Sequence, residues 1–177
     1  GYNKTEFEKT LLSFMPMEVF YLEHDADISE KQKIINSLDD ANLVIFAITN
    51  TNISASRRFG ITQSDVQFVS RIAMNHHSIL NIFASPYSLE FFPNLSDFDA
   101  VVVSYQDKSH IMRRSAEVMI GMAAAKGKLP VSAGGINAGT GIETAKTRLT
   151  YSSPAELNIN EDILKKIDST ALNGIEI

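Results

Sequence analysis

The chain has 177 residues, a length that suits one domain with a substantial core or, as we expect here, one domain followed by a tail. Its formal net charge is −5 and its basic residues are scattered, so we expect neither a nucleic-acid partner nor a membrane partner. It has no cysteine, which excludes disulfides, thiolate chemistry and cysteine-based zinc sites.

Two capping-box patterns predict helices near the start of the chain. They are Thr5 with Glu8, in a helix that Pro16 ends, and Ser29 with Gln32, in a helix that reaches about Leu38. The run between them, Met17–Leu22, is rich in β-prone side chains and predicts a strand.

Apolar runs further along predict the central strands. Leu43–Ile48 has no polar alternation, as expected of a strand that is covered on both faces. Two more strands are predicted at 78–84 and 100–104. Thr62 should cap a helix between the strand at Leu43–Ile48 and the strand at 78–84. Asp107 or Ser109 should cap a helix after the strand at 100–104.

Strands separated by helices of roughly ten residues predict a parallel sheet with helices on both faces. The predicted fold class is therefore α/β, a three-layer sandwich with a mostly parallel sheet of about five or six strands. We expect this domain to span residues 4–141 and residues 142–177 to form a linker and a short helix. Its last loop should be the run Ala133–Gly141, which contains four glycines.

The run Ser115–Ser132 carries the main family signal. A helical pattern is followed by Lys126 and Gly127, which suit a helix C-terminus, and by Pro130, which forbids continuation. This stretch resembles the close of the second domain of glycoside hydrolase family 3 enzymes, where a small-residue helix runs into a Gly-Lys-Leu-Pro-Val-Ser turn and an edge strand.

Three earlier segments resemble the same family, so that the match covers roughly Thr5 to Ser132. They are Leu43–Ile48, Ser78–Leu89 and Ala100–Gln106. The Pro-Tyr-Ser-Leu turn and the tyrosine after the strand at Ala100 resemble the β-N-acetylhexosaminidase branch.

The resemblance implies a retaining glycosidase in which an aspartate nucleophile forms a glycosyl-enzyme. That nucleophile belongs to a preceding TIM-barrel domain of about 200 residues or more, which this chain is too short to contain. In the β-glucosidase branch, a glutamate of the second domain is the acid/base. The corresponding loop here, Asn50–Gly60, holds no carboxylate and cannot protonate a leaving oxygen. This fits the hexosaminidase branch, whose acid/base is a barrel histidine paired with an aspartate.

The resemblance therefore implies no catalytic residue and no cofactor on this chain, and an exo-β-N-acetylglucosaminidase whose barrel is the partner within the same polypeptide. It also implies a periplasmic or secreted bacterial location. The tail from Thr150 to Ile177 resembles the lead-in to serine β-lactamase-like domains, on the basis of Ser152–Glu156 and the capped helix after it. This makes a downstream serine hydrolase-like domain a second candidate partner. A helix should follow from Glu161 to Leu172, capped by Asn160 and closed at Asn173-Gly174.

The loop Asn50–Gly60 is the candidate site, because ligands and partners of an open parallel sheet gather at the carboxyl ends of its strands. Arg57 and Arg58 give this loop two positive charges and no negative one. We interpret Asn50, Arg57 and Arg58 as candidate contacts to a partner or substrate, which would position and not protonate. The alternative is a solvated loop whose arginines touch nothing.

Other patterns favour no site. Asp25-x-Asp27 lacks the glycine of a calcium loop, and the adjacent His76 and His77 cannot chelate one metal from an extended segment. The glycines of 134–141 do not match a phosphate-binding spacing. The alternative function is a stand-alone flavodoxin-like domain that binds a small anionic ligand at helix N-termini.

Overall fold

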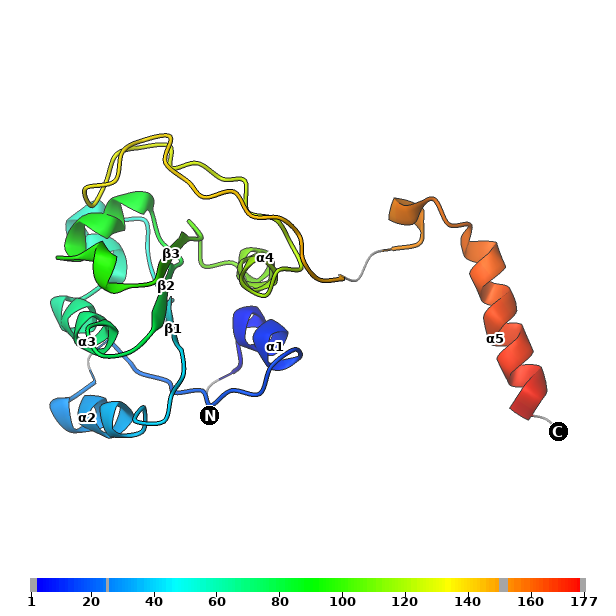
Figure 1. The fold of residues 1–177 in the computed structure, drawn as a ribbon, viewed down its shortest axis with the longest axis horizontal. Helices are drawn as coiled ribbons and strands as arrows, with labels where there is room; N and C mark the ends of the chain where they lie inside the picture. Colours follow the sequence, from blue (N-terminus) through cyan, green and yellow to red (C-terminus); the bar gives the residue numbers. More distant parts are fainter. Residues whose placement is uncertain (1–2, 25, 150–152, 176–177) are drawn as a thin grey trace. The chain divides into compact units, whose positions relative to one another are not determined.

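The computed structural model describes residues 3–24, 26–149 and 153–175 (Figure 1). The chain divides into two compact units, Gly1–Thr147 and Arg148–Ile177, which are described separately. Asp25 of the calcium-loop pattern and Ser152 of the tail pattern lie outside the described residues.

The first unit is built from strands that alternate with helices. Its strands are β1 (Val44–Ile48), β2 (Ser78–Ile82) and β3 (Ala100–Val103). Its α-helices are α1 (Glu6–Leu12), α2 (Ile28–Asn36), α3 (Gln63–Ala73) and α4 (Ser109–Met119). Three short 3-10 helices lie in its loops: η1 (Ala55–Gly60), η2 (Pro86–Phe91) and η3 (Leu95–Asp97).

The three strands form one parallel sheet in the order β1-β2-β3, with Ile45 opposite Ile79 and Ile79 opposite Ala100. The predicted α/β class and parallel sheet are confirmed. The described residues form three strands where the sequence predicted five or six. Met17–Leu22 is not paired as a strand, and the expected edge strand after Pro130 is replaced by a tight turn with an isolated bridge between Ala133 and Ile136.

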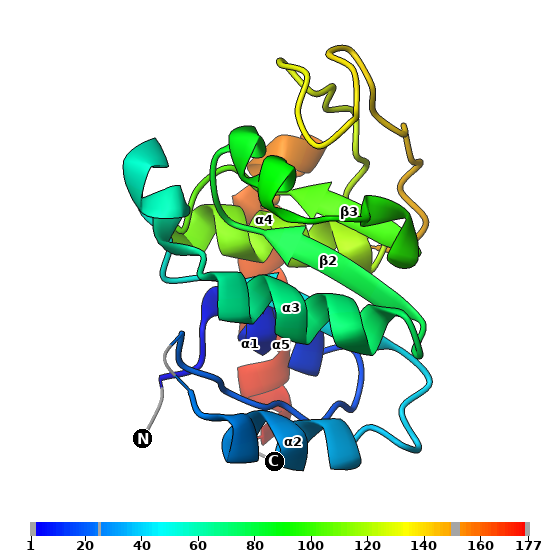
Figure 2. The ribbon, with the colours of Figure 1, turned by 90° about the vertical axis from the view of Figure 1, so that its left-hand side faces the viewer.

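Helices lie on both sides of the sheet: α2 and α3 on one, α1 and α4 on the other (Figures 1 and 2). On α3, Val66, Val69, Ile72 and Ala73 recur at helical spacing, and all four are buried in the larger core with Leu80 and Ile82. The smaller core joins α1 to α4 and is centred on Phe83, whose ring meets Phe7 edge-on at 5.5 Å.

Capping explains where these helices begin. Thr5 and Glu8 form the predicted capping box of α1, and Thr62 forms one with Asp65 on α3. The predicted start of α2 is wrong by two residues. Asp27 is its cap, accepting a hydrogen bond from the Glu30 N–H at 2.8 Å, because a carboxylate two residues earlier offers the same reciprocal pattern as Ser29.

The end of α4 also differs from the prediction. The helix ends at Met119 and not at Gly127, because Gly121, just beyond the C-cap, adopts φ +77° and the Met122 N–H donates to the Glu117 carbonyl at 2.8 Å. At the other end, Lys108 occupies the N-cap position without a side-chain cap. Neither Asp107 nor Ser109 caps the helix.

The chain beyond α4 folds back on itself, so that residues 121–129 and 139–147 run side by side (Figure 1). Leu129 donates to the Thr140 carbonyl at 2.8 Å, and Thr147 donates to the Gly121 carbonyl at 2.8 Å. These bonds give the glycine-rich run the tertiary support that its sequence lacks.

The second unit contains η4 (Ala155–Leu157) and α5 (Glu161–Ile175). Asn160 caps α5 as predicted, since its side-chain oxygen accepts from the Asp162 N–H at 2.9 Å. The predicted end is wrong, because the helix continues through Asn173-Gly174. No helix in the described ranges combines the length and apolar character needed to cross a bilayer.

Candidate functional site

The loops that follow the three strands meet at one edge of the sheet, which we call the carboxyl edge and define as residues 49–62, 84–87 and 104–108. The Asn50 N–H donates to Asp107 Oδ2 at 2.6 Å, which ties the loop after β1 to the loop after β3. The Thr51 hydroxyl donates to the Phe83 carbonyl at 2.5 Å, which ties it to the loop after β2. The carboxyl edge is therefore a connected structure.

Its backbone is unusual. Four residues other than glycine have a positive φ there: Asn50 (54°), Arg58 (52°), Phe59 (55°) and Tyr105 (64°). Left-handed backbone costs an L-residue about 1–2 kcal/mol, and residues held this way cluster at functional sites. In the described chain the other such residue, Asn158, lies in the second unit.

Arg58 is engaged within its own unit. Its guanidinium lies 4.0 Å from the centroid of the Phe91 ring, and its Nε donates to the Ile61 carbonyl at 3.3 Å. Its Nη2 also donates to Gln63 Oε1 at 3.2 Å. The alternative of a loop whose arginines touch nothing is therefore wrong for Arg58.

Arg57 differs from its neighbour. It is exposed, and its side chain has neither a hydrogen bond nor an ion pair within the part of the chain that the structure describes. Asn50 is also exposed, and its backbone N–H is the group that Asp107 holds. Of the three candidate residues, Arg58 stabilises the loop through its side chain. The side chains of Arg57 and Asn50 are exposed to solvent.

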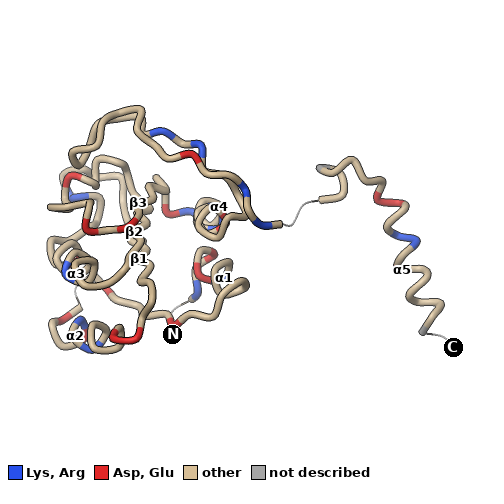
Figure 3. The backbone as a smooth tube through the Cα atoms, in the orientation of Figure 1, with Lys and Arg blue, Asp and Glu red and all other residues tan. Residues whose placement is uncertain are grey.

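Charge at the carboxyl edge is uneven. Over the first unit, acidic and basic positions are interspersed (Figure 3). The edge segments contain a single carboxylate, Asp107, whose Oδ2 already accepts from Asn50. No three His, Asp or Glu side chains of the described ranges come together in a metal-binding group.

A second polar cluster, which the sequence analysis missed, lies at the N-terminus of α3. His24 Nδ1 is 2.6 Å from Asp65 Oδ2, and the buried Lys31 donates to the Ser64 hydroxyl at 2.5 Å. These contacts attach the segment before α2, and α2 itself, to α3. Because Asp65 also accepts from the Thr62 N–H, a carboxylate already occupies this helix N-terminus.

A buried polar triangle joins Asn81 on β2, Ser104 after β3 and Ser115 on α4. Asn81 Nδ2 donates to Ser115 Oγ at 2.9 Å, and Ser104 Oγ donates to Asn81 Oδ1 at 2.8 Å. The two hydroxyl oxygens are 2.8 Å apart. Since the single hydroxyl proton of Ser104 is used by Asn81, the Ser115 hydroxyl donates to Ser104.

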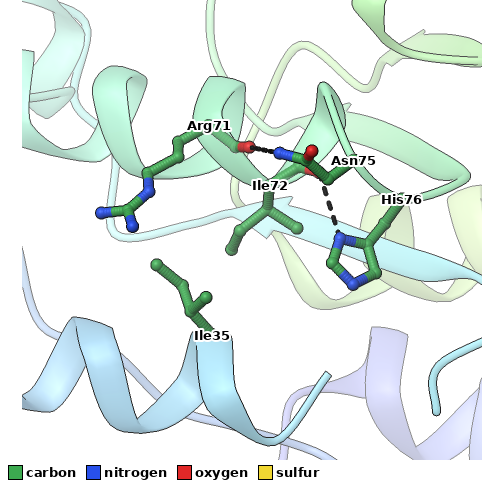
Figure 4. A pocket seen from close by; sticks show the side chains of 5 residues that line it. All are labelled: Ile35, Arg71, Ile72, Asn75 and His76. Carbon is green, nitrogen blue, oxygen red and sulfur yellow. Dashed lines mark hydrogen bonds between the residues drawn. The ribbon is translucent and has the colours of Figure 1, made fainter. Parts of the chain in front are cut away.

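The first unit also has a small cavity of about 180 Å³ between α2 and α3 (Figure 4). Ile35 and Ile72 face each other across it, with Arg71 on one side and His76 on the other. His76 Nδ1 is 3.3 Å from the Ile72 carbonyl. Four of its lining residues come shortly before β2 in the sequence, so the cavity lies toward the amino end of that strand and away from the carboxyl edge. Its volume is smaller than the roughly 300–1,000 Å³ of small-molecule sites.

Comparison of the chain with models of protein families, with curated proteins and with solved structures gives no match.

Proposed function

We propose that this chain is the second, non-catalytic α/β domain of a retaining exo-β-N-acetylglucosaminidase of glycoside hydrolase family 3. In this proposal, a preceding TIM barrel of the same polypeptide supplies the chemistry that hydrolyses the O-glycosyl bond, and the isolated chain is inactive. The observation that carries it is the chemistry of the carboxyl edge, where an exposed Arg57 accompanies one carboxylate that is already hydrogen-bonded.

A retaining glycosidase of the usual kind needs two carboxyl groups about 5–5.5 Å apart, one as nucleophile and one as acid/base. The carboxyl edge holds Asp107 as its one carboxylate, and Asp107 Oδ2 already accepts a hydrogen bond from the Asn50 N–H. What this edge offers instead is positive charge, from Arg57, Arg58 and Lys108. A fixed cation can orient an acidic group of a substrate or partner, and this is a positioning role.

We also propose that the sheet of the parent protein is wider, with five or six strands in a three-layer sandwich, and that Met17–Leu22 lies beside β1. Two observations support this. Met17 packs in the same core as Ile45 of β1, and β1 is the end strand in the sheet order. Slow amide exchange of Val19 in the full-length protein would support the pairing, and exchange at the random-coil rate would contradict it.

The second unit is proposed to lead into a downstream serine hydrolase-like domain. Its helix α5 exposes Ile163, Ile167 and Leu172, each to 58–63%. Apolar side chains at helical spacing usually pack against another element. Expression of the longer polypeptide should reduce amide exchange along α5 relative to this chain.

Assays on the isolated chain test the proposal first. We expect no turnover of a chromogenic N-acetylglucosaminide or glucoside, because neither member of the acid and nucleophile pair is present. Turnover that survives purification and disappears with a substitution in this chain would contradict the assignment. A thermal-shift screen with nucleotides, flavins and sugars is the companion measurement, and a reproducible rise in Tm with a nucleotide or flavin would favour the anion-binding alternative.

Arginine variants of the full-length enzyme test the positioning role. Replacing both Arg57 and Arg58 by Ala should raise KM or weaken domain association, and leave the pH profile of kcat unchanged. Arg57→Ala is the cleaner variant, because Arg58 also holds the loop through Phe91. Loss of one limb of the pH profile would show that the acid/base lies in this domain.

A further inference from the structure

Helix α2 is held in the first unit differently from its neighbour α3. The structure describes every residue of α2, and Lys31 is the one that is buried, with 8% exposure. Ile28 is 86% exposed, and Ile34 and Ile35 are only partly buried against the larger core. Helix α3 buries six of its 11 residues. Burial of apolar side chains therefore holds α2 less firmly than it holds α3.

Polar contacts to the start of α3 supply the rest of the attachment. The Lys31 ammonium donates to the Ser64 hydroxyl at 2.5 Å, and His24, just ahead of α2, lies 2.6 Å from Asp65. None of the ion pairs among the described residues includes Lys31. A buried ammonium that lacks a carboxylate loses hydration that its hydrogen bonds replace only in part. Water would restore this hydration if α2 moved away from α3.

The packing between the two helices is also incomplete. The cavity of about 180 Å³ separates Ile35 on α2 from Ile72 on α3 (Figure 4). Just beyond α2, Leu38 is buried in the larger core with 6% exposure, so the chain is anchored there. Helix α2 thus has an apolar anchor at its C-terminal end and a mainly polar attachment along its length.

We propose that α2 is a strap that opens from α3 and closes again while the sheet stays folded, with the Lys31–Ser64 contact as its latch. Segments with few buried apolar contacts open at a lower free energy than the whole domain unfolds. Opening hydrates the Lys31 ammonium and uncovers the surface of α3 at Ile72, which Arg71 and His76 flank. This device lies away from the carboxyl edge and does not depend on the proposed function.

The variant Ser64→Ala tests the latch. It removes the acceptor of the Lys31 ammonium and leaves a buried charge without a partner, which destabilises the closed state alone, because water solvates Lys31 in the open state. The amides of residues 32–36 should then exchange about tenfold faster or more. Adding Lys31→Met removes the buried charge as well and should return exchange to the parent rate or below it. Gln67→Ala, at an exposed position of α3, is the matched control and should leave the exchange of α2 unchanged.

Hydrogen exchange of the chain, followed by NMR at rising urea concentrations below the unfolding transition, gives the readout. In the parent chain, the amides of residues 32–36 should exchange through an opening of lower free energy than the amides of β2. They should share one dependence on urea, which shows that they open together. Exchange of α2 and β2 through one common opening overturns the inference, and so does exchange of α2 that is independent of urea. Equal α2 exchange in the parent and in Ser64→Ala also overturns it, because the latch would then be intact when α2 exchanges.

Discussion

Leu80, Ile82 and Phe83 are completely buried along β2 and just beyond it, and none of them has a positive φ. At the carboxyl edge, by contrast, Ile53 and Tyr87 are exposed and four residues are held in left-handed conformations. The same sheet supplies both regions. Side chains in the interior must pack closely and are buried. Residues at the strand ends can have left-handed backbone and exposed apolar side chains, because the interior supplies the stability of the fold.

The largest test of this contrast is Phe83→Ala. Phe83 is fully buried and meets Phe7 edge-on, so its truncation should lower the free energy of unfolding by about 3–5 kcal/mol. The matched change at the edge, Tyr87→Ala, should cost less than about 0.5 kcal/mol. Urea denaturation of the isolated chain measures both. Similar losses for the two variants would show that the edge contributes to stability as the interior does.

Asn81→Ala tests the polar part of the interior. It removes one corner of the buried triangle and leaves the hydroxyl groups of Ser104 and Ser115 with only each other as partners, so that a buried hydroxyl proton loses its acceptor, which should cost about 1–3 kcal/mol. The triple change Asn81→Val, Ser104→Ala and Ser115→Ala should be less destabilising than the single one, because no orphaned polar group remains. Chemical denaturation decides between them, and a far less stable triple variant would contradict this account.

Asp107→Ala sharpens the description of the edge. It removes the acceptor of the Asn50 N–H and should cost only about 1 kcal/mol, since the bond lies near solvent. The amide exchange of Asn50, followed by NMR, should accelerate. Gln106→Ala is the control, at an exposed neighbouring side chain, and should leave that rate unchanged. Unchanged exchange in Asp107→Ala would mean that another contact holds the loop.

The smallest expected effect concerns pH at the opposite, amino end of the sheet. The Ser78 N–H donates to Asp99 at 2.7 Å and His77 lies 3.2 Å away, and these two contacts lower the pKa of Asp99 below its ordinary value. A lowered folded-state pKa gives stability that is complete above about pH 4 and is lost as the pH falls through the folded value.

Asp99→Asn should therefore flatten the loss of stability below about pH 4 and leave its slope near neutrality unchanged. Urea melts at a series of acidic pH values provide the measurement. Asp97→Asn is a suitable control, because the Asp97 carboxylate accepts from the Asn94 side chain and not from the sheet. If stability falls equally steeply with acid in the parent and in Asp99→Asn, Asp99 does not contribute to the loss of stability below about pH 4.

Several elements could be predicted from the sequence because their causes lie within a few residues. The capping boxes at Thr5 and Thr62 act over three positions, and the buried face of α3 follows from helical spacing. The three apolar runs became the three strands. The α/β class and the parallel sheet follow from that alternation of helices and strands.

Other features depended on tertiary structure. Asp27 and Ser29 both offer capping boxes, and Gly121 and Gly127 both offer helix stops, so the surrounding packing chose between them. A strand also needs a hydrogen-bonded neighbour, which local β-propensity cannot guarantee, and Met17–Leu22 has none in the sheet.

The candidate site shows the same division. The sequence placed Asn50, Arg57 and Arg58 in a loop after β1, because a polar segment must follow a buried parallel strand. The sequence could not show that Asn50 meets Asp107 57 positions away, or that Arg58 lies over Phe91. Nor could it reveal the positive φ of Tyr105. Local backbone geometry determined the elements, and contacts between residues distant in sequence decided which side chains the carboxyl edge leaves exposed.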